Sequence, residues 1–542
     1  MRRTALAQRP KKVVAQGASI PAPVGGWDAI SPLSEMPPTN AVELVNFFPQ
    51  AGYVELRRGH IAFADTGTAD PVETVMGYQG LTPDDDRLFA ISAGTIFDVT
   101  NMGGGDPVVT GLLGNRWQHI NFTSQVGPVL WACNGLDEAQ YYDGTSWSVA
   151  NITGLDSRDM VQCVVYRGRI WTVLKNSTKA AYLALDAIQG AATEFEVGQN
   201  FRLGGHLAAI GTWSTDTVAG PDEFVAFISS YGEVAIYMIT DPDNANGISF
   251  RGVAQVGSPL GRRCLTKAGA DLIIISNDGV LPLSRAASYD KAAMIAAALS
   301  RNIQPVVAQA TRAGKDLFGW QIIAYPRGTQ AILNVPRIEG VDQEQFVMNT
   351  VTGAWCRYVG QRANCWEIWK DRPFFGGNDG VVYEADRSGL DADGSMHADM
   401  KTSFNYYGAR GRLKRWTTVR PLINTDGRMQ TGLALNVDFR DDGPSALTPP
   451  FDDGQQAHWN QFNWDQANWP IEQSYSTQWN AISGIGYCAS IQVAIDVDRP
   501  TGATSLWDTA QWDTGLWDDR PVPESVLQIN GFDVLFELGD YV

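Results

Sequence analysis

Hydrophobic and polar positions alternate in short runs over most of this chain, and a turn-forming sequence follows each run. Several segments share one form, in which an apolar strand, a glycine-containing turn and a second alternating strand follow each other. They are residues 87–100, 136–149, 226–240, 273–285, 346–359 and 374–386. Two of them contain the triplet Asn-Asp-Gly before Val, and Asp-Gly supplies the positive φ angles that a tight hairpin turn requires. We therefore expect a chain that is built mainly from antiparallel hairpins.

The spacing of these hairpins indicates a repeating architecture. Six hairpins over roughly 330 residues correspond to a period near the ~40–50 residues of a propeller blade. The pattern predicts a mainly β protein whose body, residues 56–386, is a β-propeller-like domain of about six to seven blades. An irregular multi-sheet β domain is the alternative. One apolar, alanine-rich pattern at residues 289–299 predicts a helix on the outside of a blade.

The segments on both sides of this body have different patterns. Residues 1–55 contain repeated prolines and little periodicity, which predicts an extended Pro-rich arm with a basic start. Residues 387–420 form a Gly/Asp-rich linker followed by a locally basic strand. The basic residues of that strand include Arg410, Arg412, Lys414 and Arg415. Residues 421–542 alternate again and predict an additional C-terminal β domain, which is acidic and rich in tryptophan.

Charge is distributed unevenly along the 542 residues, whose formal net charge is −18. The first 20 residues carry no acid, and their bases are Arg2, Arg3, Arg9, Lys11 and Lys12. A basic segment on an acidic chain is typical of an arm that docks on a neighbouring subunit or on a polyanion. A solvated terminus that charge keeps soluble explains the same composition. The acidic remainder is a poor wrapper of nucleic acid, because it repels phosphates.

The six cysteines indicate reduced, buried thiols made in a cytoplasm rather than a disulfide framework. None of them lies in a CxxC pair, and no histidine lies at metal-ligand spacing from them. The basic start lacks the apolar stretch of a secretion signal, and the longest apolar helical stretch, residues 292–299, is too short for a bilayer. We expect no membrane span.

Two tryptophan runs near the C-terminal end are the most unusual motif. Their members, each usually followed by Asp or Asn, are Trp459, Trp464, Trp469, Trp507, Trp512 and Trp517. A spacing of five fits neither the helical nor the strand period, so a turn-rich loop has to present them. A loop-built core is the plainest interpretation. A subunit interface and a platform that stacks on glycans are the alternatives.

No catalytic pattern is recognisable. The five histidines belong to no HExxH, and neither GxSxG nor GxxxxGK[ST] is present. The sequence therefore predicts a protein that is not an enzyme and that has no cofactor. Side chains with oxygen ligands alternate at Asp391, Asp393 and Ser395, so a calcium-binding loop is conceivable there. The remaining ligands of an EF-hand loop are missing. We expect no metal site.

The order of several short phrases resembles the tail nozzle or hub proteins of short-tailed bacteriophages. GGWDAISPLSEMPPTNAVELVNFFP leads into ELRRGH, followed by LFAISAGTIFDVT, NGLDEAQYYDGTSW and NDGVVYEAD, within residues 20–390. This family is also called tail tubular protein B or packaged-DNA stabilisation protein. The tryptophan runs and the long C-terminal domain depart from the family pattern.

The resemblance implies a β-propeller with added β domains and a structural role in the virion tail. Six copies would form a ring below the portal and adaptor, which continues the DNA channel, closes it and permits genome ejection. The implied partners are other copies of the chain, a tail adaptor or portal-side protein, tail fibre or spike proteins, and phage DNA that passes without sequence-specific binding. Assembly would take place in the host bacterial cytoplasm. The alternative is a receptor- or glycan-binding tail propeller protein.

Overall fold

The computed structural model describes residues 15–125, 127–217, 220–269, 271–286, 296–392, 394–425, 430–441, 443, 447–448, 474–475, 478–498 and 527–541. These residues belong to two compact units. The ring unit comprises the described residues within Arg58–Met396. The terminal unit comprises those within Met1–Arg57, His397–Asp498 and Ser525–Val542. The expected body of residues 56–386 thus lies within the ring unit, apart from its first two residues.

The ring unit is mainly β, and most of its sheets are four-stranded and antiparallel. Sheet I has the order β11-β9-β8-β7, from Asp106–Thr110, Thr95–Asp98, Arg87–Ser92 and Thr74–Tyr78. Sheet II contains β12 to β15, which are Gln118–Ser124, Gly127–Cys133, Gln140–Tyr142 and Trp147–Val149. Sheet III contains β17, β18, β19 and β21, which are Met160–Tyr166, Arg169–Leu174, Lys179–Tyr182 and Thr193–Glu196. Sheet IV contains β22 to β25, which are Leu207–Thr217, Gly220–Ser229, Glu233–Ile239 and Ile248–Gln255.

The remaining sheets of the ring unit follow in chain order. Sheet V contains β26 to β28, which are Leu265–Ala268, Asp271–Ser276 and Gly279–Pro282. Sheet VI contains β29 to β32, which are Gln321–Tyr325, Gln330–Ile338, Asp342–Asn349 and Trp355–Tyr358. Sheet VII has the order β6-β35-β34-β33, from Gly59–Asp65, Val381–Ser388, Arg372–Gly376 and Cys365–Trp369. Two short parallel pairs join β10 (Gly103–Gly104) to β6, and β16 (Ile152–Thr153) to β20 (Gly190–Ala191).

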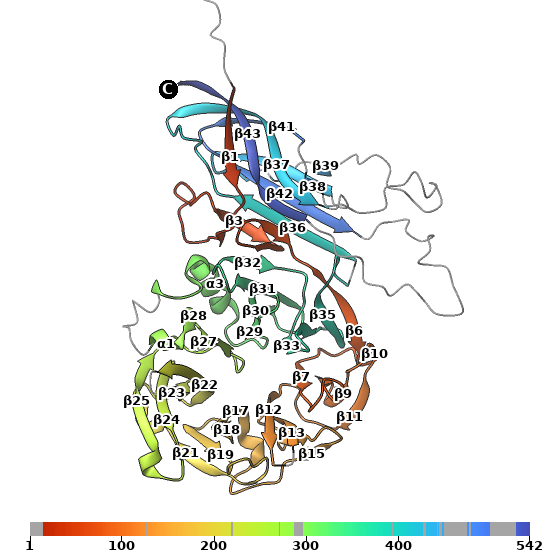
Figure 1. Ribbon diagram of the computed structural model, residues 1–542, viewed down its shortest axis with the longest axis vertical. Coiled ribbons are helices and arrows are strands. Elements are labelled where there is room, and N and C mark those ends of the chain that lie inside the picture. The colour runs from red at the N-terminus through yellow and green to blue at the C-terminus, as the bar shows by residue number, and fades with distance from the viewer. Residues whose placement is uncertain are drawn as a thin grey trace, which may run out of the picture. The chain divides into compact units, whose positions relative to one another are not determined.

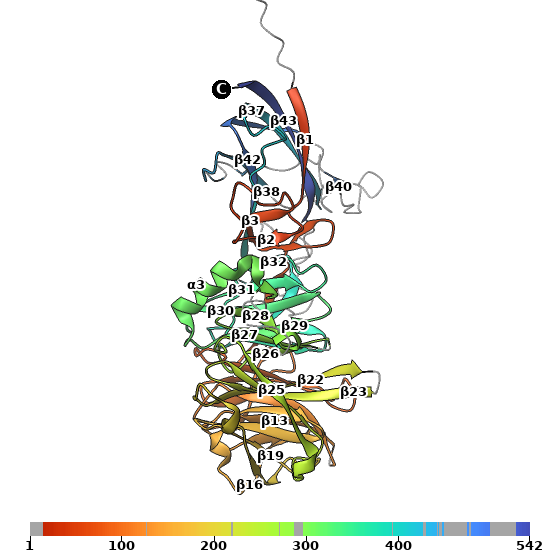
Figure 2. The same ribbon diagram turned by 90° about the vertical axis from the view of Figure 1, so that its left-hand side faces the viewer.

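These sheets follow one another around a ring, so the unit has a β-propeller-like fold (Figure 1). Apolar side chains on the facing surfaces of consecutive sheets pack together, which is what holds such blades side by side. The same packing joins sheet VII to sheet I, because Phe63, Phe374 and Val382 share a buried cluster with Val75 and Leu88. Figure 2 shows the ring from the side, with the β22–β23 hairpin extending beyond the other strands.

All six hairpins expected from the sequence are present as antiparallel pairs. They are β8–β9, β14–β15, β23–β24, β27–β28, β31–β32 and β34–β35. The described helices are short: α1 is Leu283–Ala286 and α3 is Gln304–Gly314. Single 3-10 turns occur at Ser157–Asp159, Gly198–Asn200, Ala245–Gly247 and Arg301–Ile303. Most of the helix expected at 289–299 lies outside the described residues.

The terminal unit contains two sheets that face each other. The first has the order β4-β5-β43-β37-β40, with β1 also paired to β43 and β41 to β37. In chain order its strands are β1 (Ala15–Pro21), β4 (Phe47–Pro49), β5 (Val54–Leu56), β37 (Arg412–Thr425), β40 (Ser474–Tyr475), β41 (Asn480–Gly486) and β43 (Leu527–Tyr541). The second has the order β3-β36-β42-β38-β39, with β2 beside β3. In chain order its strands are β2 (Gly26–Trp27), β3 (Asn40–Val45), β36 (Ser395–Thr402), β38 (Gln430–Val437), β39 (Leu447–Thr448) and β42 (Ala489–Asp498).

Close contact between the two sheets explains a glycine in β41. A Cβ on Gly484 would lie 2.8 Å from the side chains of Leu435 and Val437 on β38, so only a glycine lets the strands approach this closely. The alternating residues Phe532, Val534 and Phe536 of β43 are buried. The terminal unit is therefore a two-layer β structure with its own core.

Residues 1–55 were expected to form an extended arm, but the described part of this segment forms paired strands of the terminal unit. Residues 15–57 form β1 to β5, and β1 pairs with β43 from Ala15↔Glu537 to Pro21↔Gly531. The prolines end strands or begin turns: the carbonyls of Pro23, Pro32 and Pro37 each accept a backbone hydrogen bond three residues on. Residues 387–420, expected as a linker and strand, contain the end of β35, all of β36 and the start of β37.

Candidate functional site

Loops from five sheets of the ring unit line a cavity of about 570 Å³. The loops precede β7, β12, β14, β26 and β29, or follow β18. The charged lining residues are Glu73, Arg116, Lys175, Arg262, Arg263 and Asp316. Apolar side chains complete the wall, among them Leu113, Leu136, Phe318 and Trp320. The volume and the mixed lining match those of small-molecule sites.

Hydrogen bonds within the loop 134–137 fix one wall of the cavity. The side-chain oxygen of Asn134 accepts from the backbone N–H groups of Leu136 (2.9 Å) and Asp137 (2.8 Å), which closes an Asx turn. The buried carboxylate of Asp137 in turn accepts from the N–H groups of Leu113 (2.9 Å) and Gly114 (3.1 Å). The two neighbouring loops are therefore joined through one carboxylate.

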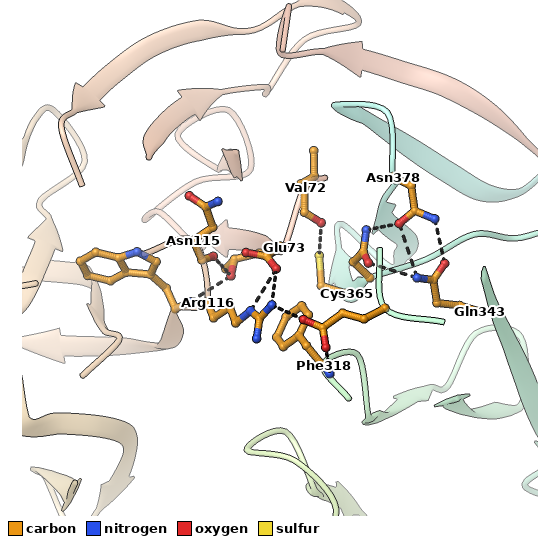
Figure 3. A network of polar contacts seen from close by, with 12 residues as sticks. Val72, Glu73, Asn115, Arg116, Phe318, Gln343, Cys365 and Asn378 are labelled. Atoms are coloured by element: carbon orange, nitrogen blue, oxygen red, sulfur yellow. Dashed lines mark hydrogen bonds and ion pairs between the residues drawn. The ribbon is translucent and has the colours of Figure 1, made fainter. Parts of the chain in front are cut away.

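Arg116 forms a second part of the lining, and Figure 3 shows its polar contacts. Its guanidinium donates to Glu73 from Nε (3.0 Å) and Nη2 (2.8 Å), and Nη2 also donates to Glu339 (2.5 Å). It lies 4.2 Å from the ring centroid of Phe318, whose N–H donates to Glu339 (3.0 Å). Burial alone would lower the pKa of Arg116, but the bonds and charges of the two glutamates raise it. Arg116 is thus already neutralised.

Arg263 also lines the cavity and is bonded to the segments that contain Glu73 and Trp117. Its Nη2 donates to the carbonyls of Glu73 (3.1 Å) and Trp117 (3.0 Å) and to the hydroxyl of Thr74 (2.9 Å). That hydroxyl donates to the Asn115 carbonyl at 2.6 Å. Burial lowers the pKa of Arg263. The cation therefore joins three segments of the chain by directional bonds.

A network of side-chain amides connects sheets VI and VII. Gln343 donates to the side-chain oxygens of Asn364 (3.2 Å) and Asn378 (3.4 Å), and Asn378 donates back to Gln343 (3.0 Å). Figure 3 shows this network near the pair in which the Cys365 thiol points to the Val72 carbonyl at 3.5 Å. Such networks stabilise one arrangement of the loops and leave few groups for chemistry.

None of the described residues that were predicted as site residues from the sequence lines this cavity. The bases Arg2, Arg3, Arg9, Lys11 and Lys12 and the six tryptophans of the two runs lie outside the described residues. Subunit docking, interface formation and glycan stacking by these residues stay predictions.

The four residues of the locally basic strand are all described. Arg410 donates to the Ser34 carbonyl (2.9 Å), and Arg412 donates to the Gly539 carbonyl (2.8 Å). Arg415 is exposed and lies 4.0 Å from Glu537. Lys414 is buried and donates to three backbone carbonyls. Three of these cations therefore bond to backbone carbonyls of their own unit.

Of the three residues that suggested a calcium-binding loop, Asp391 and Ser395 are described. Asp391 is buried, and its carboxylate lies 3.0 Å from Nδ1 of His60, whereas Asp393 lies outside the described residues. Within the described part of the chain, no three His, Cys, Asp or Glu side chains are grouped so that they could hold a metal ion.

All six cysteines are unbridged and buried, as the sequence predicted. None of the described helices has the length and apolar character needed to cross a bilayer.

Sequence reasoning missed every charged residue of the cavity. Arg116, Lys175 and Arg262 are separated by 59 and 87 positions, and each is an ordinary loop cation within its own segment. The adjacent arginines of the GRRC phrase were the one local signal. Only the ring arrangement brings these loops together.

No protein-family model matches the chain, and no curated protein matches it. Similar solved structures include BBS1N in complex with ARL6DN (13% identity, TM-score 0.37, covering 61% of this chain and 97% of that chain). They also include the computationally designed Ika8 protein (11% identity, TM-score 0.36, covering 63% and 96%). A third is YCF48 bound to a D1 peptide (10% identity, TM-score 0.35, covering 65% and 99%). All three are β-propeller proteins.

Proposed function

We propose that this protein is a structural component of a bacteriophage tail, in which six copies form a nozzle ring below the portal and adaptor. The ring continues the DNA channel, closes it and permits genome ejection. One observation carries the assembly part of this proposal. Strand β1 pairs with β43 on one side, and no described strand pairs with its other side.

The position of β1 suits docking between copies. Most of its residues are exposed, and a strand with an unpaired edge is a template for a strand of another chain. The basic residues at positions 2–12 come directly before β1, while the whole chain is acidic. Opposite charges would steer one copy toward the next and fix their register. The proposed ring is therefore held by backbone pairing and by charge.

The ring unit is, in our proposal, a β-propeller of seven blades. Seven antiparallel sheets are present in its described part, and β6 joins the sheet that β33, β34 and β35 form at the other end of the unit. Closing the first and last blades through one shared sheet removes open sheet edges from the ring. Such a rigid body supports a structural role well.

The assembly proposal is tested by light scattering coupled to size exclusion and by electron microscopy of the full chain. The test variant lacks residues 1–14 and so keeps β1. We expect hexameric rings for the full chain and mainly monomers for the variant, with an unchanged melting temperature. A variant with glutamine at the five basic positions separates charge from chain length.

Two results would contradict the proposal. A full chain that stays monomeric under every condition would exclude the ring. Normal assembly of the variant without residues 1–14 would show that the segment does not dock. The alternative of a glycan-binding tail protein predicts that Trp464→Ala and Trp512→Ala abolish binding to cells or glycans, and unchanged binding would end that alternative.

A further inference from the structure

Two cations of the cavity, Arg262 and Lys175, use only one of their N–H donors each in the hydrogen bonds of the structure. Arg262 donates from Nη1 to the Asn134 carbonyl (3.1 Å), and Lys175 donates to the Gly135 carbonyl (3.2 Å). A guanidinium has five N–H donors and an ammonium has three. Neither residue forms an ion pair with any described carboxylate. Both side chains are exposed, so their remaining donors are accessible from the cavity.

The two cations are held at one place by the same loop. Asn134 and Gly135 are consecutive, and the Asx turn and the Asp137 bonds fix this loop. Arg262 and Lys175 come from different sheets, and nothing in either segment alone would bring them together. Their carbonyl acceptors orient them but do not neutralise them. The result is a preorganised pair of positive groups at a cavity wall.

The charge balance of the lining is positive. Four cations face two carboxylates of the lining and that of Glu339 beside it, and Glu73 and Glu339 are already engaged by Arg116. Although Arg262 as a whole is exposed, its guanidinium is partly desolvated, which lowers the pKa of Arg262, and the positive charge of Arg116 acts in the same direction. Positive groups that lie close together without a counter-charge are stabilised by a bound anion. Asp316 is the one exposed carboxylate of the lining that would oppose such an anion.

We propose that this cavity binds a small, multiply charged oxyanion of the phosphate or pyrophosphate class, held mainly by Arg262 and Lys175. Guanidinium and ammonium donors form strong charge-assisted bonds with phosphate oxygens. At about 570 Å³ the cavity also has room for an ester group, which would contact the exposed Leu113 and Leu136. This site does not depend on the proposed ring assembly, because every residue that forms it belongs to one ring unit.

The test is calorimetric titration of the full chain with inorganic pyrophosphate, and in parallel with a short single-stranded oligonucleotide. Arg262→Gln and Lys175→Gln should each weaken pyrophosphate binding about tenfold, since each removes a charge-assisted bond. Asp316→Asn should tighten binding, because it removes the opposing charge. Lys267→Gln and Arg327→Gln are matched controls, since both side chains are exposed and neither lines the cavity.

The outcomes separate the possible sources of the anion. Pyrophosphate binding that only the cavity substitutions weaken supports the proposal for a free anion. Oligonucleotide binding that the same substitutions weaken supports the same chemistry with a nucleic-acid backbone as its source. If neither probe binds at millimolar concentration, or if the double variant Arg262→Gln/Lys175→Gln binds as the wild type does, the proposal is wrong. Melting temperatures of all variants check that they are folded.

Discussion

Lys414 illustrates how a charged residue is accommodated in the interior of the terminal unit. Its side chain is 1% exposed, and Nζ donates to the carbonyls of Ala409 (2.5 Å), Arg412 (3.0 Å) and Tyr487 (2.8 Å). An ammonium has three donors, and all are used. Burial lowers the pKa of Lys414. The cation therefore ties β37 to the turn before it and to the segment before β42.

Replacement of Lys414 by Met should lower the free energy of unfolding by about 2–3 kcal/mol, because bonds to a charged donor are lost and buried carbonyls lose their partner. Arg415→Met is the control from the same strand. Arg415 is exposed, so its loss should change stability by no more than about 0.5 kcal/mol. Urea unfolding monitored by tryptophan fluorescence measures both. Equal effects of the two substitutions would contradict this account.

At this strand the period carries information about burial that residue charge alone does not. Lys414 and Trp416 are two positions apart, so they lie on one face, and both are buried. The hairpin turns show a similar limit. Ser276 pairs with Gly279, so Asn277 and Asp278 form the loop, and the positive φ of +112° falls on Gly279 alone. The residue types predicted a turn, but the pairing decided which residue takes the unusual angle.

At the scale of elements, Asp533 links three strands of the terminal unit. It lies on β43 opposite Ser19 of β1 and Arg420 of β37. Ser19 donates its hydroxyl to Oδ1 at 2.5 Å, and Nε of Arg420 donates to Oδ2 at 3.1 Å. The bond from Ser19, followed by that from Arg420, lowers the pKa of Asp533. One carboxylate thus helps to set the register of β1 on β43.

The stability that Asp533 contributes should depend on pH. Its folded pKa lies below the unfolded value, so the contribution is complete above about pH 4 and is lost as the pH falls through the lowered folded pKa. Asp533→Asn should cost about 1 kcal/mol at pH 7, and the difference from the wild type should shrink in more acidic solution. Urea unfolding at several pH values measures this. Glu537→Gln on the same strand is the control and should show little effect; a difference for Asp533→Asn that is independent of pH would contradict the prediction.

Elements with nearby partners could be predicted, and elements with distant partners could not. The hairpin β34–β35 has its turn and both strands within residues 372–388, so the local pattern contains everything that forms it. In contrast, β1 pairs with β43 more than 500 positions away, and its seven residues read locally as an arm. Period and turn signals describe a strand but do not identify a remote neighbour.

At the scale of the whole molecule, the chain forms the terminal unit from segments on both sides of the ring unit. Residues 15–57 supply β1 to β5, and residues 397–541 supply most of the other strands. The sequence indicated a propeller-like body and β-rich flanks, because hairpin spacing is a repeated local signal. It could not indicate that the flanks fold together. For the same reason it could not place Glu73, Arg116 and Arg262 around one cavity.

Deletion of residues 1–57 should unfold the terminal unit and leave the ring unit folded. The deletion removes β1, β3 and β5, which pair with β36 and β43, whereas sheet VII begins at Gly59. Hydrogen exchange read by mass spectrometry should show loss of protection at residues 412–425 and 527–541 and retained protection at residues 74–98. The variant without residues 1–14 should keep both. Loss of protection throughout the deletion variant would show that the two units fold only together.

The pairing of β1 with β43 also sets the order of events during synthesis. At roughly 5–20 residues per second, the ribosome adds the ~340 residues between β5 and β36 in about 20–70 s, and domains generally fold as they emerge. The strands β1, β3 and β5 therefore lack their later partners, β36 and β43, while the ring unit completes itself. The proposed docking edge comes into existence only after β43 has emerged. In the proposed assembly, nascent chains on one polysome would therefore acquire this docking edge only after each ring unit is complete.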